Sequence, residues 1–129
     1  MPVASKLSVV IVDDQMTIRS LVRTALNQIA INDIREFGIA EDALKHIKAH
    51  APNVVISDFN MAGMDGLELL QGIRADAKLK STAFILLTAR AEKELVQRAV
   101  QLGANNFLVK PFNIATLKQK IEQVVGALT

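Results

Sequence analysis

Four short apolar runs constrain the fold of this chain more than any other feature of its sequence. They lie at residues 7–12, 54–56, 83–87 and 107–109, and each is continuous and rich in β-branched or bulky side chains. Strands buried on both faces have this pattern, which is typical of a parallel sheet covered by helices on both sides. A weaker fifth strand is expected at residues 34–37, where apolar and charged residues are mixed as in a partly exposed edge strand.

Between these runs lie segments whose apolar residues recur at steps of three and four, the spacing of one helix face. The five apolar stripes fall within residues 18–29, 40–47, 67–73, 95–102 and 114–128. A glycine at position 103 is expected to end the fourth helix in the left-handed conformation. Regular alternation of strand and helix predicts an α/β fold: a doubly wound, five-stranded parallel sheet with five helices and right-handed crossovers.

The chain has 129 residues, the size of one ordinary domain. Half of its residues are apolar and 22% are charged, a composition that can bury a core and does not suggest disorder. We therefore expect a single domain over residues 1–129, with residues 1–6 as a loose tail. No apolar run is long enough for a membrane span or a signal peptide, so we expect a cytoplasmic protein without membrane insertion.

Polar residues stand where the apolar runs end. The first run leads into Asp13 and Asp14, the second into Asp58, the third into Thr88 and the fourth into Lys110. Ligands of open α/β sheets bind beyond the carboxyl ends of the strands, so these side chains are expected to converge on one rim although they are distant in sequence.

Three carboxylates at close range repel one another, and at least one pKa rises unless a cation neutralises them. With few protein ligands and a phosphate partner, the chemistry favours Mg²⁺ over Ca²⁺, which takes more protein oxygens. A carboxylate beside such an ion can attack phosphorus to form an aspartyl-phosphate, while Thr88 and Lys110 offer hydrogen bonds and positive charge. The set therefore predicts phosphoryl transfer.

Each of these residues also has an ordinary structural interpretation. The pair Asp13 and Asp14 can cap the next helix, and Asp58 can open a turn. Thr88 can cap a helix, and Lys110 can be a solvated strand end. Four such coincidences at four successive strands favour one functional site over separate structural roles.

The sequence has no cysteine, which excludes disulfides and thiolate zinc sites. Its two histidines, His46 and His50, are four apart on a predicted helix away from the rim, and we interpret them as surface residues. A metal at the rim is therefore expected to be bound by oxygen. A formal net charge of +2 and the absence of Trp and Tyr argue against direct nucleic-acid binding.

The rim residues occur within four motifs: VIVDDQMTIR at 10–19, VVISDFNMAGMDGLELL at 54–70, LLTAR at 86–90 and VKPF at 109–112. As a set, the motifs resemble the receiver domains of bacterial two-component signalling, and most closely the chemotaxis response regulators of the CheY type. The resemblance covers nearly the whole chain. It implies a flavodoxin-like sheet with strand order 2-1-3-4-5.

The resemblance also assigns roles at the rim. It implies that Asp58 accepts a phosphoryl group from the phosphohistidine of a histidine kinase. Mg²⁺ would be held by Asp14, Asp58 and the backbone carbonyl of Asn60, with Asp13 acting through water. The resemblance also implies a signalling protein rather than an enzyme, although one that catalyses its own phosphorylation and dephosphorylation.

Further roles follow from the same resemblance. Thr88 would follow the phosphoryl group and Lys110 would contact it, while Phe107 matches an aromatic switch position where chemotaxis members usually carry Tyr. Asn60 and Arg90 would tune hydrolysis of the aspartyl-phosphate. The Lys110-Pro111 peptide bond is expected to be cis, as in the family.

Output is expected through partner binding on the face of the fourth helix, fifth strand and fifth helix, at about residues 91–120. The partners implied are the histidine kinase, a flagellar motor switch protein or another output protein, and a phosphatase. One departure from the family pattern is Ala62, which stands where a proline is usual and suggests a less rigid loop after Asp58.

Other functions remain open on the sequence. A receiver acting only as a phosphate sink has the same residues. A hydrolase of the haloacid dehalogenase type would need a second carboxylate two residues after its nucleophile, where this chain has Asn60. A nucleotide or flavin carrier would need a Gly-rich or Ser/Thr-rich loop after the first strand, where this chain has DDQMT.

Overall fold

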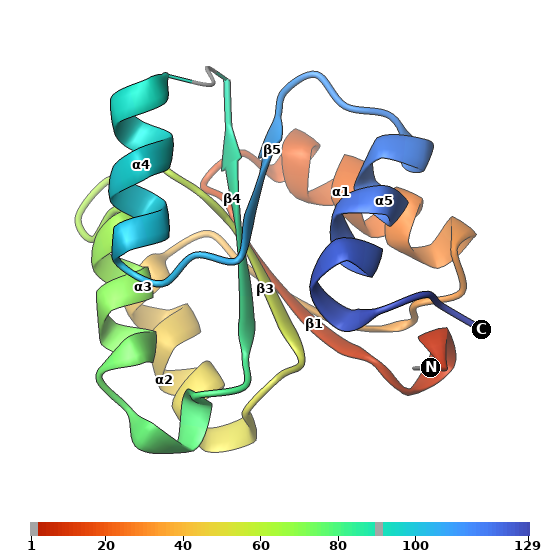
Figure 1. Cartoon of the computed structure of the whole chain (residues 1–129), viewed down its shortest axis with the longest axis horizontal. Coiled ribbons are helices and arrows are strands. Elements are labelled where there is room, and N and C mark those ends of the chain that lie inside the picture. Colours follow the sequence, from red (N-terminus) through yellow and green to blue (C-terminus); the bar gives the residue numbers. More distant parts are fainter. Residues whose placement is uncertain (1–2, 90–91) are drawn as a thin grey trace.

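A five-stranded parallel sheet forms the centre of the molecule in the computed structural model, which describes residues 3–89 and 92–129 (Figure 1). Its strands are β1 (Ser8–Val12), β2 (Asp33–Phe37), β3 (Val54–Asp58), β4 (Ala83–Thr88) and β5 (Asn106–Val109). They are ordered β2-β1-β3-β4-β5, and every neighbouring pair is parallel. The doubly wound fold and the strand order 2-1-3-4-5 are therefore confirmed.

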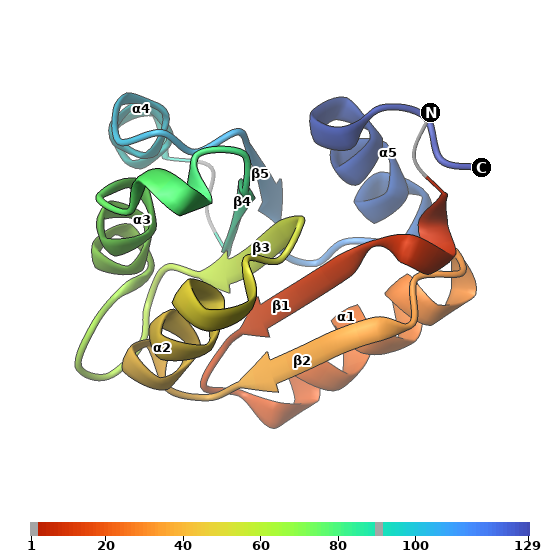
Figure 2. The same ribbon diagram turned by 90° about the horizontal axis from the view of Figure 1, so that it is seen from below.

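Five α-helices cover the sheet in two layers. They are α1 (Met16–Gln28), α2 (Ala40–His50), α3 (Gly66–Arg74), α4 (Lys93–Gln101) and α5 (Ile114–Val125). Helices α1 and α5 lie on one face, and α2, α3 and α4 lie on the other, as the two perpendicular views show (Figures 1 and 2). Short 3-10 helices η1 (Ala4–Lys6) and η2 (Ala77–Leu79) complete the described elements.

Two apolar cores lie on the two faces of the sheet because successive strand side chains point to opposite sides. In β1, for example, Val9 and Ile11 belong to the core that includes residues of α1 and α5, whereas Val10 and Val12 belong to the core that includes residues of α2 and α3. All four side chains are buried. This two-sided burial explains why the strand is a continuous apolar run in the sequence.

Strands β3 and β4 extend beyond the apolar runs that predicted them. Asp58 is the last residue of β3 and pairs with Leu87, and Thr88 is the last residue of β4 and pairs with Val109. The backbone ladder continues because it depends on peptide groups rather than on side-chain polarity. Both polar residues are therefore fixed by the sheet itself.

Three apolar residues predicted to belong to core-facing helix stripes are exposed instead. Leu21 and Val100 each keep 59% of their accessible surface, and Ile114 keeps 39%. The predicted stripes were wider than the strip of helix surface that contacts the sheet, so residues at the stripe edge stay outside the core. Leu21 and Ile114 line the same groove between α1 and α5.

The expectation of a loose tail over residues 1–6 is wrong for the part that the structure describes. Ala4–Lys6 forms η1, Ala4 is buried, and its backbone N–H donates to the Thr129 carbonyl at 3.2 Å. Segment η1 is thus tied to the last residue of the chain. This contact joins opposite ends of the sequence, so no local pattern predicted it.

Gly103 follows α4 with a φ of 105°, so the predicted left-handed residue after the fourth helix is confirmed. Within residues 3–89 and 92–129, no helix is both long and apolar enough to cross a membrane.

Candidate functional site

Three carboxylates meet at the carboxyl edge of the sheet. Asp13 and Asp14 follow β1, and Asp58 ends the neighbouring strand β3. One carboxylate oxygen from each residue lies within 4.8 Å of the others. Asp13 is fully buried and Asp58 is 8% exposed, whereas Asp14 is exposed. The rim predicted from the sequence therefore exists, and it opens to solvent through Asp14.

Lys110 supplies positive charge to this cluster. Its ammonium Nζ donates to Asp13 Oδ2 and to Asp58 Oδ1, at 3.2 Å in both cases. The residue follows β5, which is separated from β3 by β4, so its side chain reaches across the rim. The Lys110-Pro111 peptide bond is cis, as the resemblance implied.

Burial, with a contribution from the nearby Asp13 carboxylate, raises the pKa of Asp58, and Lys110 offsets this in part. Among the described residues, one ammonium contacts two of the three carboxylates, so these groups retain a formal excess of negative charge. A hard divalent cation would remove this excess, and carboxylate oxygens are the ligands that Mg²⁺ prefers. The residues present therefore fit a magnesium ion.

The backbone of Asp13 is held from behind the cluster. Arg19, on α1, donates from its guanidinium to the Asp13 carbonyl at 2.7 Å and forms an ion pair with Glu36 of β2 at 3.4 Å. The Gln15 backbone N–H donates to Asp13 Oδ1 at 2.9 Å. Asp13 is thus fixed at both its backbone and its side chain, which the sequence interpretation did not foresee.

Helix α3 begins against the backbone of Asp58. Gly66, its first residue, donates its N–H to the Phe59 carbonyl at 3.0 Å. A Cβ atom at position 66 would lie 2.3 Å from the Asp58 carbonyl oxygen, so only glycine fits without displacement. Asp65 and Glu68 form a capping box that fixes this start of the helix.

The loop between Asp58 and α3 is attached to α2. Glu41 Oε1 accepts a hydrogen bond from the Met64 backbone N–H at 3.2 Å, and Gly63 lies beside the same carboxylate with a φ of 75°. This contact reaches the loop that lacks the usual proline at Ala62. Asn60, in the same loop, is exposed beside Asp58.

Thr88 and Phe107 lie on the same face of the sheet. Phe107 pairs with Leu86, and Thr88 lies two residues beyond Leu86 on the same strand, so all three side chains point to the α2, α3 and α4 side. Thr88 is 5% exposed, whereas Phe107 is half-buried with Lys120 Nζ 4.7 Å from its ring centroid. Of the other predicted residues, Arg90 lies outside the described residues.

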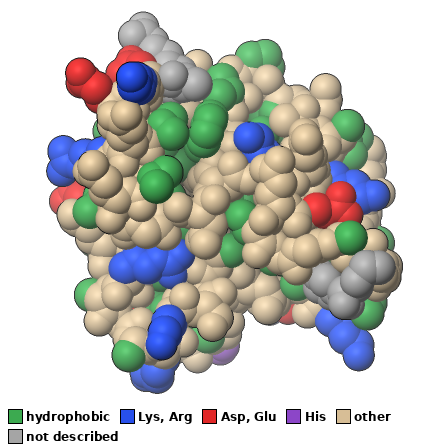
Figure 3. All heavy atoms as spheres, in the orientation of Figure 1, with side chains coloured by type: hydrophobic (Ala, Val, Ile, Leu, Met, Phe, Trp, Pro, Cys, Tyr) green, Lys and Arg blue, Asp and Glu red, His purple; other side chains and the backbone are tan. Residues whose placement is uncertain are grey.

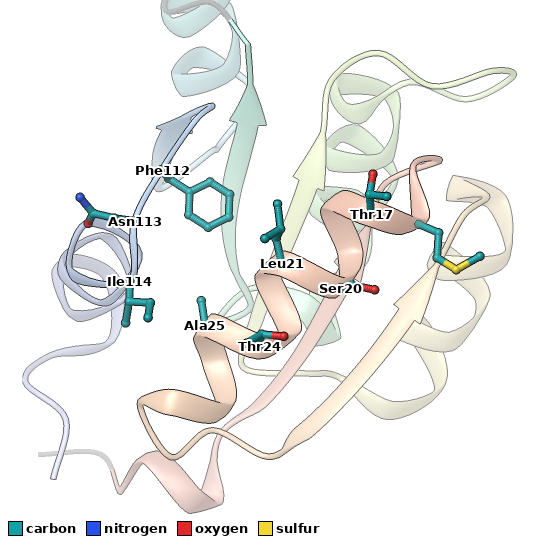
Figure 4. Close-up of a pocket in the computed structure, with 9 residues that line it drawn as sticks. Thr17, Ser20, Leu21, Thr24, Ala25, Phe112, Asn113 and Ile114 are labelled. Atoms are coloured by element: carbon teal, nitrogen blue, oxygen red, sulfur yellow. The ribbon is translucent and has the colours of Figure 1, made fainter.

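An apolar groove of about 720 Å³ lies between α1 and the start of α5, next to the acidic cluster. Figure 4 shows Leu21 of α1 and Phe112 pointing toward one another across it, with Ile114 on the α5 side. The groove starts close to the cluster, because Met16 follows Asp14 by two residues and Phe112 follows Lys110 by two residues. It went unnoticed in the sequence because Leu21 and Ile114 have the spacing of core residues.

Comparison with known proteins agrees with this geometry. The profile of the response regulator receiver domain family matches residues 9–122, and the chain belongs to that family. The chain is 48% identical over 128 residues to a Rhizobium etli protein named as a probable chemotaxis protein CheY, covering 99% of both chains. It is 38% identical over 122 residues to chemotaxis protein CheY-3 of Vibrio cholerae, covering 95% of this chain and 94% of the other. The protein is thus a receiver domain of the CheY type.

Solved structures give the same result for the fold. The structure of chemotaxis response regulator CheY4 of Vibrio cholerae superimposes with a TM-score of 0.84 at 33% identity, covering 92% of this chain and 98% of the other. The receiver domain of a Pseudomonas aeruginosa sensor histidine kinase, described with a magnesium ion coordinated in its active site cleft, has a TM-score of 0.84 at 21% identity, covering 94% and 98%. At that identity, the second likeness concerns the fold alone. Proteins of this type are signalling proteins rather than conventional enzymes.

Proposed function

We propose that this protein is a phosphorylation-switched response regulator that accepts a phosphoryl group on Asp58 from the phosphohistidine of a histidine kinase. In this proposal it signals by binding an output protein, a flagellar motor switch protein in chemotaxis. The observation that carries the proposal is the buried Asp58 carboxylate, joined at 3.2 Å to Lys110 within a cluster of three carboxylates. A structural ion pair would not need the two additional acidic groups.

The transfer balances as one bond formed and one broken. A carboxylate oxygen of Asp58 attacks phosphorus, the bond from phosphorus to the donor imidazole nitrogen breaks, and the imidazole leaves with the bonding pair and then takes up a proton. Lys110 Nζ would transfer one of its contacts from the carboxylate to a phosphoryl oxygen. Thr88, at the end of the adjacent strand β4, would donate its hydroxyl to another.

The metal in this proposal is Mg²⁺, held by Asp14, Asp58 and the Asn60 carbonyl, with Asp13 acting through water. When bound, it supplies positive charge that offsets repulsion between the acidic cluster and the incoming phosphoryl group. Asp14 suits a direct contact because it is exposed, whereas Asp13 already accepts hydrogen bonds from Gln15 and Lys110.

The groove between α1 and α5 is a suitable seat for the phosphodonor domain. The donor must bring its phosphohistidine to Asp58, and the groove presents exposed apolar side chains from Leu21 and Ile114 beside that site. We expect Leu21→Asp to slow phosphotransfer from the kinase while phosphorylation by acetyl phosphate stays unchanged, because the small donor needs no docking surface. An equal effect on both donors would show that the groove affects the chemistry rather than docking.

The output surface is assigned to α4, β5 and α5. Thr88 and Phe107 share one face of the sheet beside α4, and Lys120 of α5 contacts the Phe107 ring. Movement of Thr88 toward the phosphoryl group would open space for Phe107 to turn inward and reshape this surface. Figure 3 shows hydrophobic side chains gathered beside α4 on the face presented by the β5 edge. A partner that prefers the inward form would stabilise it by its difference in affinity.

Acetyl phosphate and a motor-switch peptide together test the proposal. We expect labelling of the wild-type protein that is stable in acid and lost in alkali, no labelling of Asp58→Asn, and tighter peptide binding after phosphorylation. Labelling of Asp58→Asn would overturn the acceptor assignment. Labelling of the wild type without any gain in peptide affinity would contradict the motor-control role and favour the phosphate-sink alternative.

A further inference from the structure

A polar hollow lies toward the amino-terminal edge of the sheet, opposite the edge that carries the acidic cluster. It has a volume of about 400 Å³ and is lined by the amino-terminal residues of β1 and β2, including Ser8 and Asp33, and by the last turn of α2. His46 and His50 contribute imidazoles to the hollow, and Arg35 contributes a cation. None of these residues takes part in the proposed phosphoryl transfer, so the hollow needs a separate explanation.

The two imidazoles face one another on the helix surface. His46 and His50 are four residues apart in α2, and residues at that spacing are neighbours on one helix face. Their ring centroids are 4.5 Å apart with an angle of 33° between the rings. Neither imidazole forms a hydrogen bond with another residue within the described part of the chain. Their ring nitrogens are therefore available to a ligand.

Two imidazoles at this spacing are a known arrangement for binding a transition metal from one helix face. Nitrogen ligands favour borderline ions such as Zn²⁺ and Cu²⁺ and disfavour Mg²⁺, which prefers oxygen. Asp33 lines the same hollow, but it does not form a three-ligand cluster with the two imidazoles and contributes a nearby negative charge rather than a third ligand. From this juxtaposition we infer that His46 and His50 form a second metal site, for a borderline divalent transition ion, with the Asp33 carboxylate as its neighbouring anionic group.

The surroundings of His46 also suit metal binding. Burial lowers the pKa of His46, with smaller contributions in the same direction from His50 and Arg35, while Asp33 acts in the opposite direction. Neutral imidazole is the form that binds metals. His46 also packs against Phe37, with ring centroids 5.2 Å apart, so its side chain is partly fixed before an ion arrives.

Charges around the hollow predict opposite effects for two substitutions. Removal of the Arg35 cation by Arg35→Gln should strengthen Zn²⁺ binding because it removes repulsion of the incoming ion. Removal of the Asp33 carboxylate by Asp33→Asn should weaken binding severalfold. A hydrophobic or purely structural role of the histidine pair would give neither of these changes.

The histidine ring signals in NMR provide a direct test, because His46 and His50 are the only histidines in the sequence. The full chain without an affinity tag is titrated with Zn²⁺ in the presence of excess Mg²⁺, which occupies oxygen sites. We expect both ring signals to shift in one saturable transition with a Kd below about 0.1 mM. Mg²⁺ alone should leave both signals unchanged.

Substitutions complete this experiment. His50→Gln should raise the Kd at least about tenfold, since one of two ligands is lost, and His46→Gln should do the same. Lys48→Gln, a change at an exposed position of the same helix, is the matched control and should leave the Kd unchanged. His50 is exposed, so His50→Gln keeps the test valid if His46→Gln fails to fold. Ring signals that do not respond to Zn²⁺, or an unchanged Kd in His50→Gln, would overturn the inference.

Discussion

Substitution of Gly66 by alanine tests how closely the fold and the phosphorylation site depend on one another. The added Cβ would lie 2.3 Å from the Asp58 carbonyl oxygen and 3.0 Å from the Phe59 Cα, and both of these are backbone atoms. A strand that is hydrogen-bonded on both sides cannot move without loss elsewhere, so helix α3 and the end of β3 must separate. The acceptor carboxylate would then shift relative to Lys110.

Two opposing effects set the size of the change. Alanine in place of glycine stabilises a helix by up to about 1 kcal/mol where space allows. Overpacking against a rigid neighbour costs about 1 to 3 kcal/mol and sometimes more. Because the contact at position 66 is with backbone, the cost exceeds the gain, and we expect Gly66→Ala to lower the free energy of unfolding by about 2 kcal/mol.

Gly72→Ala is a matched control in the same helix. A Cβ at Gly72 would meet the tip of the Leu44 side chain at 2.8 Å, and a flexible side-chain end can move aside cheaply. The control should therefore range from neutral to about 1 kcal/mol more stable. Urea unfolding measures both variants, and acetyl phosphate labelling should be slowed only in Gly66→Ala. Equal stability and equal labelling of the two variants would refute the close approach of α3 to Asp58.

Three further predictions concern the charges and the switch of the site. Asp58 has a raised pKa in the folded protein, so the stability of the wild type should fall relative to that of Asp58→Asn as the pH rises from about 4 toward neutrality. Urea unfolding midpoints measured without Mg²⁺ at acidic and neutral pH check this, and a difference in stability that does not depend on pH would contradict it. Asp14→Ala should weaken Mg²⁺ binding about tenfold in a calorimetric titration, and Asp13→Ala should do so less, because Asp14 is expected to contact the ion directly; the reverse order would exchange their roles. Phe107→Tyr should reduce the inward population of the unphosphorylated protein, because the added hydroxyl favours solvent; relaxation-dispersion NMR measures this population, and an equal or larger value in the variant would defeat the idea.

Much of the fold follows from the sequence because its pattern reflects backbone topology. A strand such as Val54–Asp58 is buried on both faces, so nearly every side chain in it must be apolar, and this produces a visible run. Parallel strands place their carboxyl ends at one edge, so Asp58 and Thr88 could be placed near each other without knowledge of any side-chain contact. The position of this rim could therefore be predicted from the order of strands and helices alone.

Contacts between side chains and distant backbone atoms could not be predicted in this way. Glu41 binds the Met64 N–H from another helix, and Arg19 binds the Asp13 carbonyl from behind the cluster. In the sequence, both are charged residues on helices, which are usually solvated. Leu21 presents the opposite problem, because its helical spacing matches that of buried neighbours while its side chain lines an open groove. A buried and an exposed residue of one helical stripe differ only in whether the neighbouring elements extend far enough to cover them.

The scaffold fixes the backbones of the two buried acidic residues. Arg19 donates a hydrogen bond to the carbonyl of Asp13. The carbonyl of Asp58 accepts a hydrogen bond from the Ser57 hydroxyl at 2.9 Å and lies against Gly66. This arrangement leaves the Asp58 carboxylate with Lys110 as its side-chain partner within the described residues. Full neutralisation of the cluster by further protein cations would stabilise the resting fold but would also remove the attraction for a metal ion. The excess of negative charge, together with a rigid backbone that prevents the carboxylates from moving apart, keeps the site receptive to a divalent cation and hence to a phosphoryl group.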